Sequence, residues 1–316
     1  MKYFDRAAVL AATPMPALID AMEQAFRTPP IAPPRHHHNM ASGTANEADA
    51  TLLLMPAWRS GQRVGVKVAT VFPDAHRHNM PSVQATYLLS DGKTGELQAV
   101  LDGTMLTARR TAAASALAAK YLSRNDARTL LLVGTGTLVP HLIEAHCSIR
   151  PIDRVLIWGR DPDKAKALIA AHQPVADGLW QAVSDLKEAA AEADIISCAT
   201  LSEQPLILGD WLSPGTHIDL VGGFKPTMRE TDDRTLLRAR VFVDTRAGAL
   251  QEAGDLTQPI AAGLFCATDV VAELSELCRG DCSGRLTAEE ITLFKSVGAS
   301  LEDLAAAELV CETGVR

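Results

Sequence analysis

The sequence predicts an α/β protein, with a doubly wound parallel sheet in one domain and a second domain of the α+β type. Three observations lead to this prediction. The apolar run Thr129–Val133 ends in the turn Gly134-Thr135-Gly136 and enters a helix-compatible stretch. Apolar strands and helical segments then alternate at the spacing of βαβ units. The first third of the chain instead shows strands separated by turn residues.

The first third begins with a predicted helix over 15–26. The proline-rich run 28–34 excludes regular helix directly after it. Strand-like segments follow at 51–55, 63–69, 82–89 and 97–101, and Asp91-Gly92 and Thr94-Gly95 supply turn signals before the last of them. These segments predict an antiparallel sheet.

From Thr111 an alanine-rich helix replaces the strand pattern. The strands expected after it cover 129–133, 154–158, 180–183, 194–199, 216–221 and 240–244. The last segment, 288–308, has the apolar spacing of a helix. The alternation predicts a doubly wound sheet.

Composition and charge indicate a protein that acts on small molecules. The chain has 316 residues, 47% apolar and 22% charged, which is enough for two domains with their own cores. The formal net charge is −8 and the isoelectric point is near 5.6. Without a basic field, we expect neither nucleic acid nor an anionic membrane as a partner.

Location and metal binding follow from what the sequence lacks. No apolar run reaches the ~20 residues that span a bilayer, and the first residues, MKYFDRAAVL, show no signal-peptide pattern, so we expect a cytoplasmic protein. The six cysteines form no CxxC pair, which argues against a disulfide framework or a zinc site. The triplet His36-His37-His38 alternates sides in an extended segment and has no accompanying cluster of ligands, so no metal is expected.

The glycine turn after 129–133 predicts dinucleotide binding. Glycine allows the tight turn and the close approach of the backbone to a pyrophosphate, which the N–H groups and the helix dipole then bind. Val139 replaces the usual third small residue, and Pro140 falls in the first helical turn, where proline is tolerated. A plain buried βα turn is the alternative. The cofactor contacts expected in this turn are Gly134, Thr135, Gly136, Thr137 and Leu138.

The end of the second strand indicates which dinucleotide is bound. An NAD-preferring site places a carboxylate there to accept from the ribose 2′-OH. This chain has Gly159 followed by Arg160, which favours NADPH over NADH and makes both residues cofactor contacts. Asp161 before Pro162 is expected to cap the next helix. Ala199 and Thr200 end the strand 194–199 and are expected beside the nicotinamide half.

Six blocks in order point to one family. They are VGVKVATVFP, LLSDGKTGELQAVLDGTMLTARRTAAASALAA, VGTGT, GTHIDLVGGFKPTMRE, VFVDTRAGALQEAGDL and ITLFKSVGASLEDLAAA. Together they resemble the ornithine cyclodeaminase and mu-crystallin family of NAD(P)-binding proteins. The resemblance implies a Rossmann-type domain over 113–292 and a substrate-binding and dimerisation domain formed by 1–112 and 293–316, hence a homodimer. It also implies further cofactor contacts from Thr111, Val221, Gly222, Ser296, Val297 and Gly298.

The resemblance also implies three cations in the substrate site: Arg35, Lys67 and Arg110. A cyclic imino acid needs a cation for its carboxylate and a donor that keeps its nitrogen protonated, and a guanidinium grips a carboxylate bidentately. Lys67 is the catalytic candidate, and the proton donor stays open between Lys67 and bound water. Periodicity alone predicts a solvent-facing Lys67, because Val64, Val66 and Val68 occupy the other strand face.

Phe224 decides between activities within this family. Cyclodeaminases carry an aspartate after the glycine pair that handles the substrate amine, and a phenyl ring cannot do so. We therefore predict NAD(P)H-dependent reduction of Δ1-pyrroline-2-carboxylate, or its six-membered piperideine analogue, to L-proline or L-pipecolate. An ornithine cyclodeaminase, an alanine-type dehydrogenase and a non-catalytic NADPH-binding protein like mu-crystallin remain as alternatives. Asp219 is open between a substitute base and a structural carboxylate.

Overall fold

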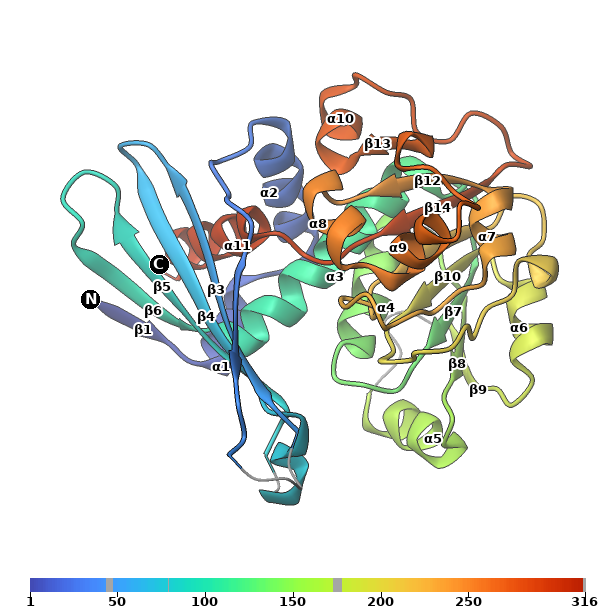
Figure 1. Ribbon diagram of the computed structural model, residues 1–316, viewed down its shortest axis with the longest axis horizontal. Coiled ribbons are helices and arrows are strands. Elements are labelled where there is room, and N and C mark those ends of the chain that lie inside the picture. Colours follow the sequence, from blue (N-terminus) through green and yellow to red (C-terminus); the bar gives the residue numbers. More distant parts are fainter. Residues whose placement is uncertain (44–47, 79, 173–177, 315–316) are drawn as a thin grey trace. The chain divides into compact units, whose positions relative to one another are not determined.

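The protein folds as two compact units (Figure 1). The computed structural model describes residues 1–43, 48–78, 80–172 and 178–314. The first unit comprises Met1–Arg110 and Ala299–Arg316, and the second comprises Thr111–Gly298. Helix α3 (Gly103–Leu122) runs through the boundary, so one continuous helix links the two units. Among the described residues, no helix is long and apolar enough to cross a membrane.

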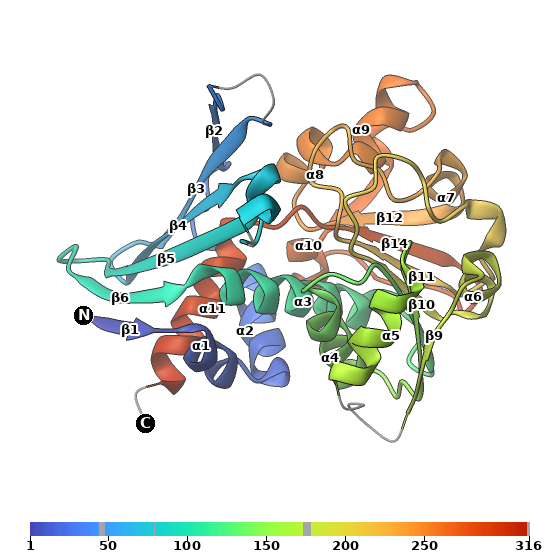
Figure 2. The same ribbon diagram turned by 90° about the horizontal axis from the view of Figure 1, so that it is seen from below.

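The first unit is built on a six-stranded sheet in the order β1-β6-β5-β4-β3-β2. Strands β2 to β6 pair antiparallel. The sequence predicts β3 to β6 in this antiparallel sheet, but it predicts neither β2 nor β1, which pairs parallel to β6. The strands are β1 (Lys2–Phe4), β2 (His36–Met40), β3 (Ala50–Arg59), β4 (Arg63–Val71), β5 (Val83–Asp91) and β6 (Leu97–Asp102). A 3₁₀ helix, η1 (Pro73–His78), joins β4 to β5. Figure 2 shows helices α1 (Arg6–Ala12), α2 (Met15–Arg27) and α11 (Ser300–Thr313) on one face of this sheet.

The two faces of this sheet differ in burial, and the difference corrects the sequence-based expectation for Lys67. One row of cross-strand neighbours is buried to 3% exposure or less: Met55, Lys67, Tyr87 and Leu101. The adjacent row on the other face is only half-buried: Pro56, Val66, Leu88 and Val100. The solvent-facing position that periodicity alone predicts for Lys67 is therefore wrong, whereas the family resemblance implied a place in a site. Helix α11 packs on β3, β4 and β5 and covers the lysine face, so the valines occupy the more open side.

The second unit contains an eight-stranded, all-parallel sheet in the order β13-β12-β14-β11-β10-β7-β8-β9. The six strands predicted from the sequence are all present, within about a residue at each end. They are β7 (Thr129–Val133), β8 (Arg154–Trp158), β9 (Leu179–Ala182), β10 (Ile195–Cys198), β11 (His217–Leu220) and β12 (Ala239–Val243). Strands β13 (Val270–Glu273) and β14 (Ile291–Lys295) complete the sheet.

Strand β14 corrects the prediction of a helix over 288–308. The strand lies between β11 and β12, all five of its residues are buried, and α11 begins only at Ser300. A short apolar run buried on both faces has no alternation, so periodicity cannot tell it from a buried helix.

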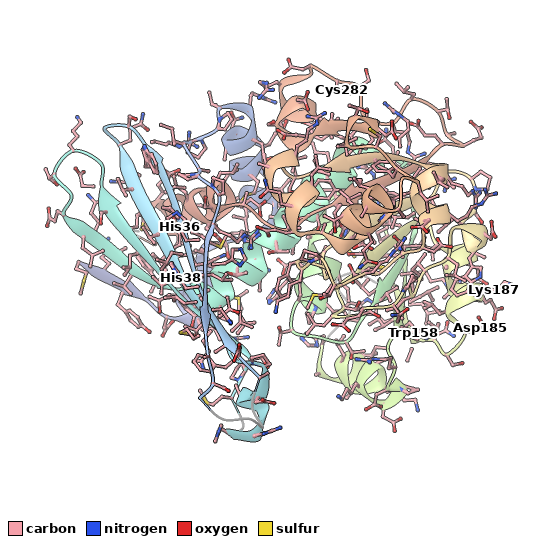
Figure 3. The ribbon with its side chains drawn as sticks, viewed as in Figure 1. His36, His38, Trp158, Asp185, Lys187 and Cys282 are labelled. Carbon is pink, nitrogen blue, oxygen red and sulfur yellow. The ribbon has the colours of Figure 1, made fainter. Side chains whose placement is uncertain are left out.

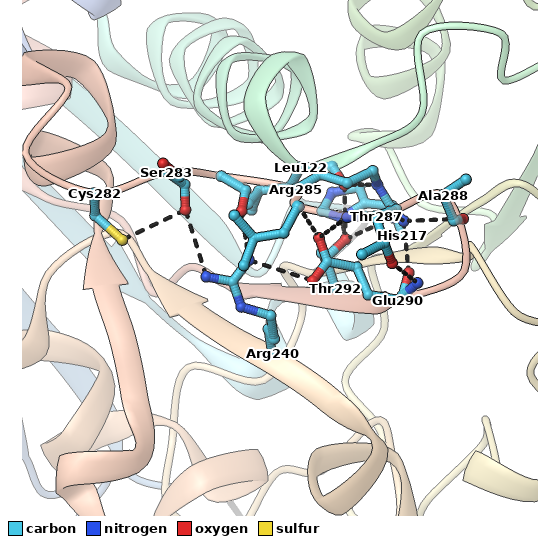
Figure 4. A network of polar contacts seen from close by, with 12 residues as sticks. Leu122, His217, Arg240, Cys282, Ser283, Arg285, Thr287, Ala288, Glu290 and Thr292 are labelled. Atoms are coloured by element: carbon cyan, nitrogen blue, oxygen red, sulfur yellow. Dashed lines mark hydrogen bonds and ion pairs between the residues drawn. The ribbon is translucent and has the colours of Figure 1, made fainter.

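An arginine in the preceding loop fixes the start of β14 (Figure 4). The Arg285 guanidinium donates to the Leu122 carbonyl at 2.8 Å and to Thr292 Oγ1 at 3.1 Å. Thr292 Oγ1 donates to the same carbonyl at 2.8 Å and lies 3.0 Å from Nδ1 of His217. Arg240 donates to the Gly284 carbonyl in the same loop. These bonds tie β14 to the end of α3 and to β11.

Helices pack on both faces of the parallel sheet, as a Rossmann-type fold requires. Apolar residues of α6 (Leu186–Glu192), α7 (Asp233–Arg238), α8 (Arg246–Glu252) and α9 (Gly254–Ala261) join one core with the strands. Helix α4 (Val139–Ile149) contacts β7, and its His146 lies 3.5 Å from Asp219 on β11. The remaining helices are α5 (Pro162–Ala171), α10 (Leu274–Arg279), η2 (Gly209–Trp211) and η3 (Ala267–Asp269).

The order of the strands locates the ligand crevice of the second unit. Strand β7 is followed by β8 on one side, whereas β10 lies on its other side. This reversal is a topological switch point, and open parallel sheets bind ligands outside the carboxyl ends of the strands at such a point. The glycine turn after β7 and the residues after β10 both lie there.

Candidate active site

In the first unit, Lys67 and Arg110 meet on one carboxylate that the sequence reasoning missed. The Lys67 ammonium lies 2.8 Å from Oδ2 of Asp303 and donates to its Oδ1 at 2.9 Å. The Arg110 Nε donates to the same Oδ1 at 3.0 Å. Asp303 is completely buried and Lys67 is 3% exposed, so both charges are withdrawn from water.

A second buried carboxylate holds the other edge of Arg110. Glu302 Oε2 accepts from Arg110 Nη1 at 2.6 Å, and its Oε1 accepts from the backbone N–H of Ala299 at 3.2 Å. Glu302 and Asp303 lie in the first turn of α11. Acidic residues at this position are usually exposed to solvent and interact favourably with the helix dipole. Their flanking apolar residues, Leu301 and Leu304, are the sequence signal that this turn is buried.

Arg35 contributes to the electrostatic field of the same cluster. Burial lowers the pKa of Lys67 from 10.5 to about 8; the charge of Asp303 opposes this shift, while Arg110 and Arg35 add to it. The three cations expected from the sequence thus act on one another. Their positive charge lies beside the two buried carboxylates Glu302 and Asp303.

Arg109, the neighbour of Arg110, bonds to Thr13 and does not join this cluster through these contacts. Its guanidinium donates to Oγ1 of Thr13 at 3.3 Å and to the Thr13 carbonyl at 2.5 Å. Because it is almost fully buried and holds the end of α1, Arg109 has a structural role.

In the second unit, the turn after β7 has the features of a pyrophosphate site. Gly134 has φ +130°, and a Cβ there would lie 2.7 Å from the Ala199 carbonyl oxygen, so only glycine fits. Its N–H donates to the Trp158 carbonyl at 2.8 Å. The backbone N–H groups of residues 135–138, which lead into α4, donate no hydrogen bond to any other described residue. Such N–H groups at a helix start suit a diphosphate.

The end of β8 approaches this turn closely. A Cβ on Gly159 would lie 2.6 Å from Cγ2 of Thr135, so a larger residue would require the Thr135 side chain to shift. Arg160 follows and is exposed. Asp161 accepts from the Asp163 N–H at 3.1 Å and caps α5, which confirms the expected cap. Trp158, labelled in Figure 3, ends the strand.

Among the expected nicotinamide-side residues, Thr200 and Gly222 are held by one buried carboxylate, and Val221 and Ala199 are held by backbone carbonyls. The N–H and Oγ1 of Thr200 donate to Glu230, as does the Gly222 N–H, while Val221 donates to the Cys198 carbonyl. These N–H and hydroxyl groups already donate hydrogen bonds within the protein. Ala199 N–H likewise continues the ladder to Val133.

The segment after β14 is held in the same way. Val297 and Gly298 each donate their N–H to Oδ2 of Asp244 at 2.7 Å, and Ser296 Oγ donates to it at 3.1 Å. Sequence reasoning identified this segment but missed Asp244. Thr111, the last of the expected cofactor residues, lies buried in α3.

Asp219, which the sequence left open, and Asp255 both lie in buried networks of the second unit. Asp219 is completely buried, accepts from Ser197 Oγ at 2.6 Å and lies 3.5 Å from Nε2 of His146. Asp255 accepts from the N–H of Glu230 at 2.8 Å and pairs with Lys295 at 3.1 Å.

The histidine triplet forms edge strand β2, where His36 and His38 are exposed (Figure 3). Within the described ranges, no three His, Cys, Asp or Glu side chains are grouped so that they could hold a metal ion.

Comparison with known proteins identifies the family. The model of the Ornithine cyclodeaminase/mu-crystallin family matches residues 3–315. The chain belongs to this family. A Delta(1)-pyrroline-2-carboxylate reductase of Colwellia psychrerythraea is 41% identical over 297 residues, covering 93% of each chain.

Solved structures agree with this assignment. The Delta(1)-pyrroline-2-carboxylate reductase of Thermococcus litoralis, in complex with NADH and L-proline, has a TM-score of 0.92 and 32% identity over 100% of this chain and 98% of the other. An archaeal alanine dehydrogenase dimer with bound NAD has a TM-score of 0.90 and 28% identity over 100% and 96%. The Rossmann-type fold and the family expected from the sequence are confirmed.

The shared carboxylate makes a testable prediction for Lys67. In Asp303→Asn the pKa of Lys67 should fall further below about 8, because the charge that opposes desolvation is gone. Removing one partner of a buried pair should also lower the free energy of unfolding by about 3–5 kcal/mol. The measurement is an NMR titration of lysine labelled at ¹³Cε, with the Lys67 resonance assigned by Lys67→Arg.

Glu308→Gln is the matched control for this titration, because Glu308 lies on the same helix but pairs with Arg59. It should leave the pKa of Lys67 unchanged. An unshifted Lys67 titration in Asp303→Asn would contradict the assigned pairing.

Proposed function

We propose that this protein is an NAD(P)H-dependent reductase that converts Δ1-pyrroline-2-carboxylate into L-proline. The piperideine analogue, which yields L-pipecolate, is the second substrate of the proposal. The observation that carries it is the buried cluster in which Lys67 and Arg110 share Asp303 and Arg35 adds a third cation. The pyrroline-2-carboxylate reductases among its relatives support the same substrate.

The cation cluster fits both ends of a cyclic imino acid. Arg110 and Arg35 supply positive charge for the single carboxylate, and a guanidinium does so with directed hydrogen bonds. The pKa of Lys67, about 8, lies close to neutral pH, where a general acid is effective. Lys67, or a water molecule beside it, is the proposed source of the proton on the imine nitrogen.

The second unit fits a dinucleotide. The turn Gly134–Leu138 would hold the pyrophosphate on its N–H groups, and Gly159 and Arg160 would lie beside the adenosine ribose. When bound, the cofactor supplies the hydride that adds to the imine carbon while the nitrogen keeps its proton, and it leaves oxidised. Productive transfer requires the nicotinamide C4 and the imine carbon to be aligned.

Phe224 favours imine reduction over cyclodeamination. It is half-buried after Gly222-Gly223, and the Lys225 ammonium lies 5.9 Å from its ring centroid. A phenyl ring neither accepts a proton nor pairs with an ammonium group. Reduction of a cyclic imine that is already formed needs neither function.

The open face of the six-stranded sheet supports a homodimer. The half-buried row Pro56, Val66, Leu88 and Val100 crosses four strands and carries no charge, and Leu54 with Val68 extends it. A contiguous apolar face on a folded unit marks an interaction site. A second copy of the chain is the proposed occupant, because the alanine dehydrogenase with similar fold is a dimer.

The function is tested by the loss of the absorbance of NADPH, which disappears when its nicotinamide ring is oxidised. Purified protein is incubated with pyrroline-2-carboxylate, with pyruvate plus ammonia, and with ornithine plus NAD. We expect rapid oxidation with the imine alone. Ammonia-dependent turnover would instead identify an amino-acid dehydrogenase, and proline formed from ornithine would identify a cyclodeaminase. Silence in all three while NADPH binds would favour a binding protein.

The proposed preference for NADPH rests on Arg160. Arg160→Ala should weaken NADPH binding about tenfold or more, since a charge-assisted hydrogen bond to the 2′-phosphate is worth about 1.5–3 kcal/mol, and should barely affect NADH. Fluorescence titration measures both affinities. Arg154→Ala, which removes a cation paired with Glu192 at the start of β8, is the control. Tighter binding of NADH than NADPH by the unaltered protein would refute the preference.

The proposed dimer predicts a solution mass of about twice the 33.7 kDa of one chain by light scattering. Val66→Glu should give monomers, because it places a charge in the centre of the apolar row. Leu286→Glu changes an exposed leucine of the second unit and should leave the mass unaltered. A monomeric unaltered protein would rule out this assembly.

A further inference from the structure

A buried carboxylate, Glu230, joins the loops that follow two neighbouring strands of the parallel sheet. Its Oε1 accepts from the N–H of Thr200 at 2.7 Å and from the Thr200 hydroxyl at 2.9 Å, and its Oε2 accepts from the Gly222 N–H at 2.9 Å. Thr200 follows β10 and Gly222 follows β11. One side chain without solvent exposure therefore sets the spacing of both loops.

Glu230 is itself fixed by a second layer of charges. Its N–H donates to Oδ1 of Asp255 at 2.8 Å, and its carbonyl accepts from the N–H groups of Leu206 and Ile207. The other oxygen of Asp255 lies 3.1 Å from the ammonium of Lys295, the last residue of β14. The network thus extends from the end of β10 across β11 to the end of β14.

The glycine pair in this loop is required by the close approach to these groups. A Cβ on Gly222 would lie 1.9 Å from the Thr200 carbonyl oxygen and 2.5 Å from Oε1 of Glu230. A Cβ on Gly223 would lie 2.9 Å from Oδ2 of Asp255. The loop therefore approaches Thr200, Glu230 and Asp255 more closely than a side chain at either position would allow.

Two loops could be joined at a lower cost in free energy by neutral side chains than by a buried carboxylate. Burying a carboxylate costs several kcal/mol unless its oxygens are fully hydrogen-bonded, and this one accepts three bonds. Burial raises the pKa of Glu230 to about 7, an effect opposed by Lys295 and by the bonds from Thr200 and reinforced by Asp255. The carboxylate thus lies near the boundary between its two protonation states at neutral pH.

We propose that Glu230 is a positioning residue for the nicotinamide half of the cofactor: by holding Thr200 and Gly222 at a fixed spacing, it shapes the surface against which the ring lies. This inference rests on the proposed function, because the crevice outside β10 and β11 is the place where such a fold binds its ligand. Glu230 does not touch the reacting atoms and acts through the two loops.

The protonation state of Glu230 should control this arrangement. The ionised Glu230 carboxylate accepts hydrogen bonds from all three donors. When Glu230 is protonated, one of its oxygens carries a proton and faces a group that also donates, so that hydrogen bond is weakened. Three ionisable side chains face it: Lys295 on β14, Asp255 on α9 and Cys198 on β10. Burial keeps the pKa of the Cys198 thiol well above 9, so Cys198 does not titrate near neutral pH. The ordered arrangement should be present above about pH 7 and lost below it.

The test uses the fluorescence of bound NADPH, which reports the environment of the nicotinamide ring without turnover. The unaltered protein should show a transition in emission near pH 7, and Glu230→Gln should remove it. NADPH affinity should change less than about threefold, while kcat for the imine should fall about tenfold or more, because small displacements of a reacting group are costly.

Thr200→Val is the second variant and is milder, since it removes only the hydroxyl bond. That bond lowers the pKa of Glu230, so the transition should move to higher pH in this variant. Asp219→Asn is the matched control, because it neutralises another buried carboxylate on β11 that contacts Ser197 and His146 instead. It should leave the transition in place.

The outcomes separate this proposal from the proposed function. An unchanged emission transition in both Glu230→Gln and Thr200→Val would overturn the positioning role, whatever the protein reduces. Inactivity towards pyrroline-2-carboxylate together with the predicted emission changes would overturn the substrate and retain the role of Glu230.

Discussion

The burial of charge in the first unit is the constraint on which the proposed chemistry depends. An ammonium group moved out of water costs several kcal/mol unless a counter-charge accompanies it. Asp303 is that counter-charge for Lys67, and it binds Arg110 at the same time. Helix α11 must therefore return to the sheet from the far end of the sequence. The last eighteen residues belong to the first unit for this reason as well as for their apolar packing.

Buried carboxylates also fix the structure of the second unit. Glu230 fixes the loops after β10 and β11, and Asp244 fixes the segment after β14. In each case a buried carboxylate uses the backbone N–H groups that would otherwise point into the crevice. The turn after β7 differs, because the N–H groups of residues 135–138 have no such acceptor in the described chain. These free N–H groups support the proposed diphosphate site in this turn.

Much of the fold could be predicted because it depends on local patterns. The glycine turn after Val133, the cap at Asp161 and six of the eight parallel strands all follow from short stretches of sequence. Strand β14 could not be recognised, because a run buried on both faces shows no periodicity. Lys67 was misplaced by periodicity because the apolar valines lie on the face that carries no helix.

The candidate site was predictable only in part. Lys67, Arg110 and Arg35 came from a family resemblance, and the structure places them in one electrostatic cluster. Their partners Glu302 and Asp303 are remote in sequence, and a Glu-Asp pair in a first helical turn is common on protein surfaces. The flanking Leu301 and Leu304 indicate that this turn is buried, but only the tertiary fold shows which cations its two carboxylates meet. The roles of Glu230 and Asp244 could not be predicted either, because the groups they bind are remote in sequence.

The most direct test of the account is the steady-state kinetics of Arg110→Ala with pyrroline-2-carboxylate, measured beside Arg63→Ala. Arg63 lies on the same strand as Lys67 but bonds to Gln98, outside the cluster. The account predicts a raised KM and a strong loss of kcat/KM for Arg110→Ala and near-normal values for Arg63→Ala. Normal values for a folded Arg110→Ala protein would contradict the claim that this cluster binds the substrate carboxylate.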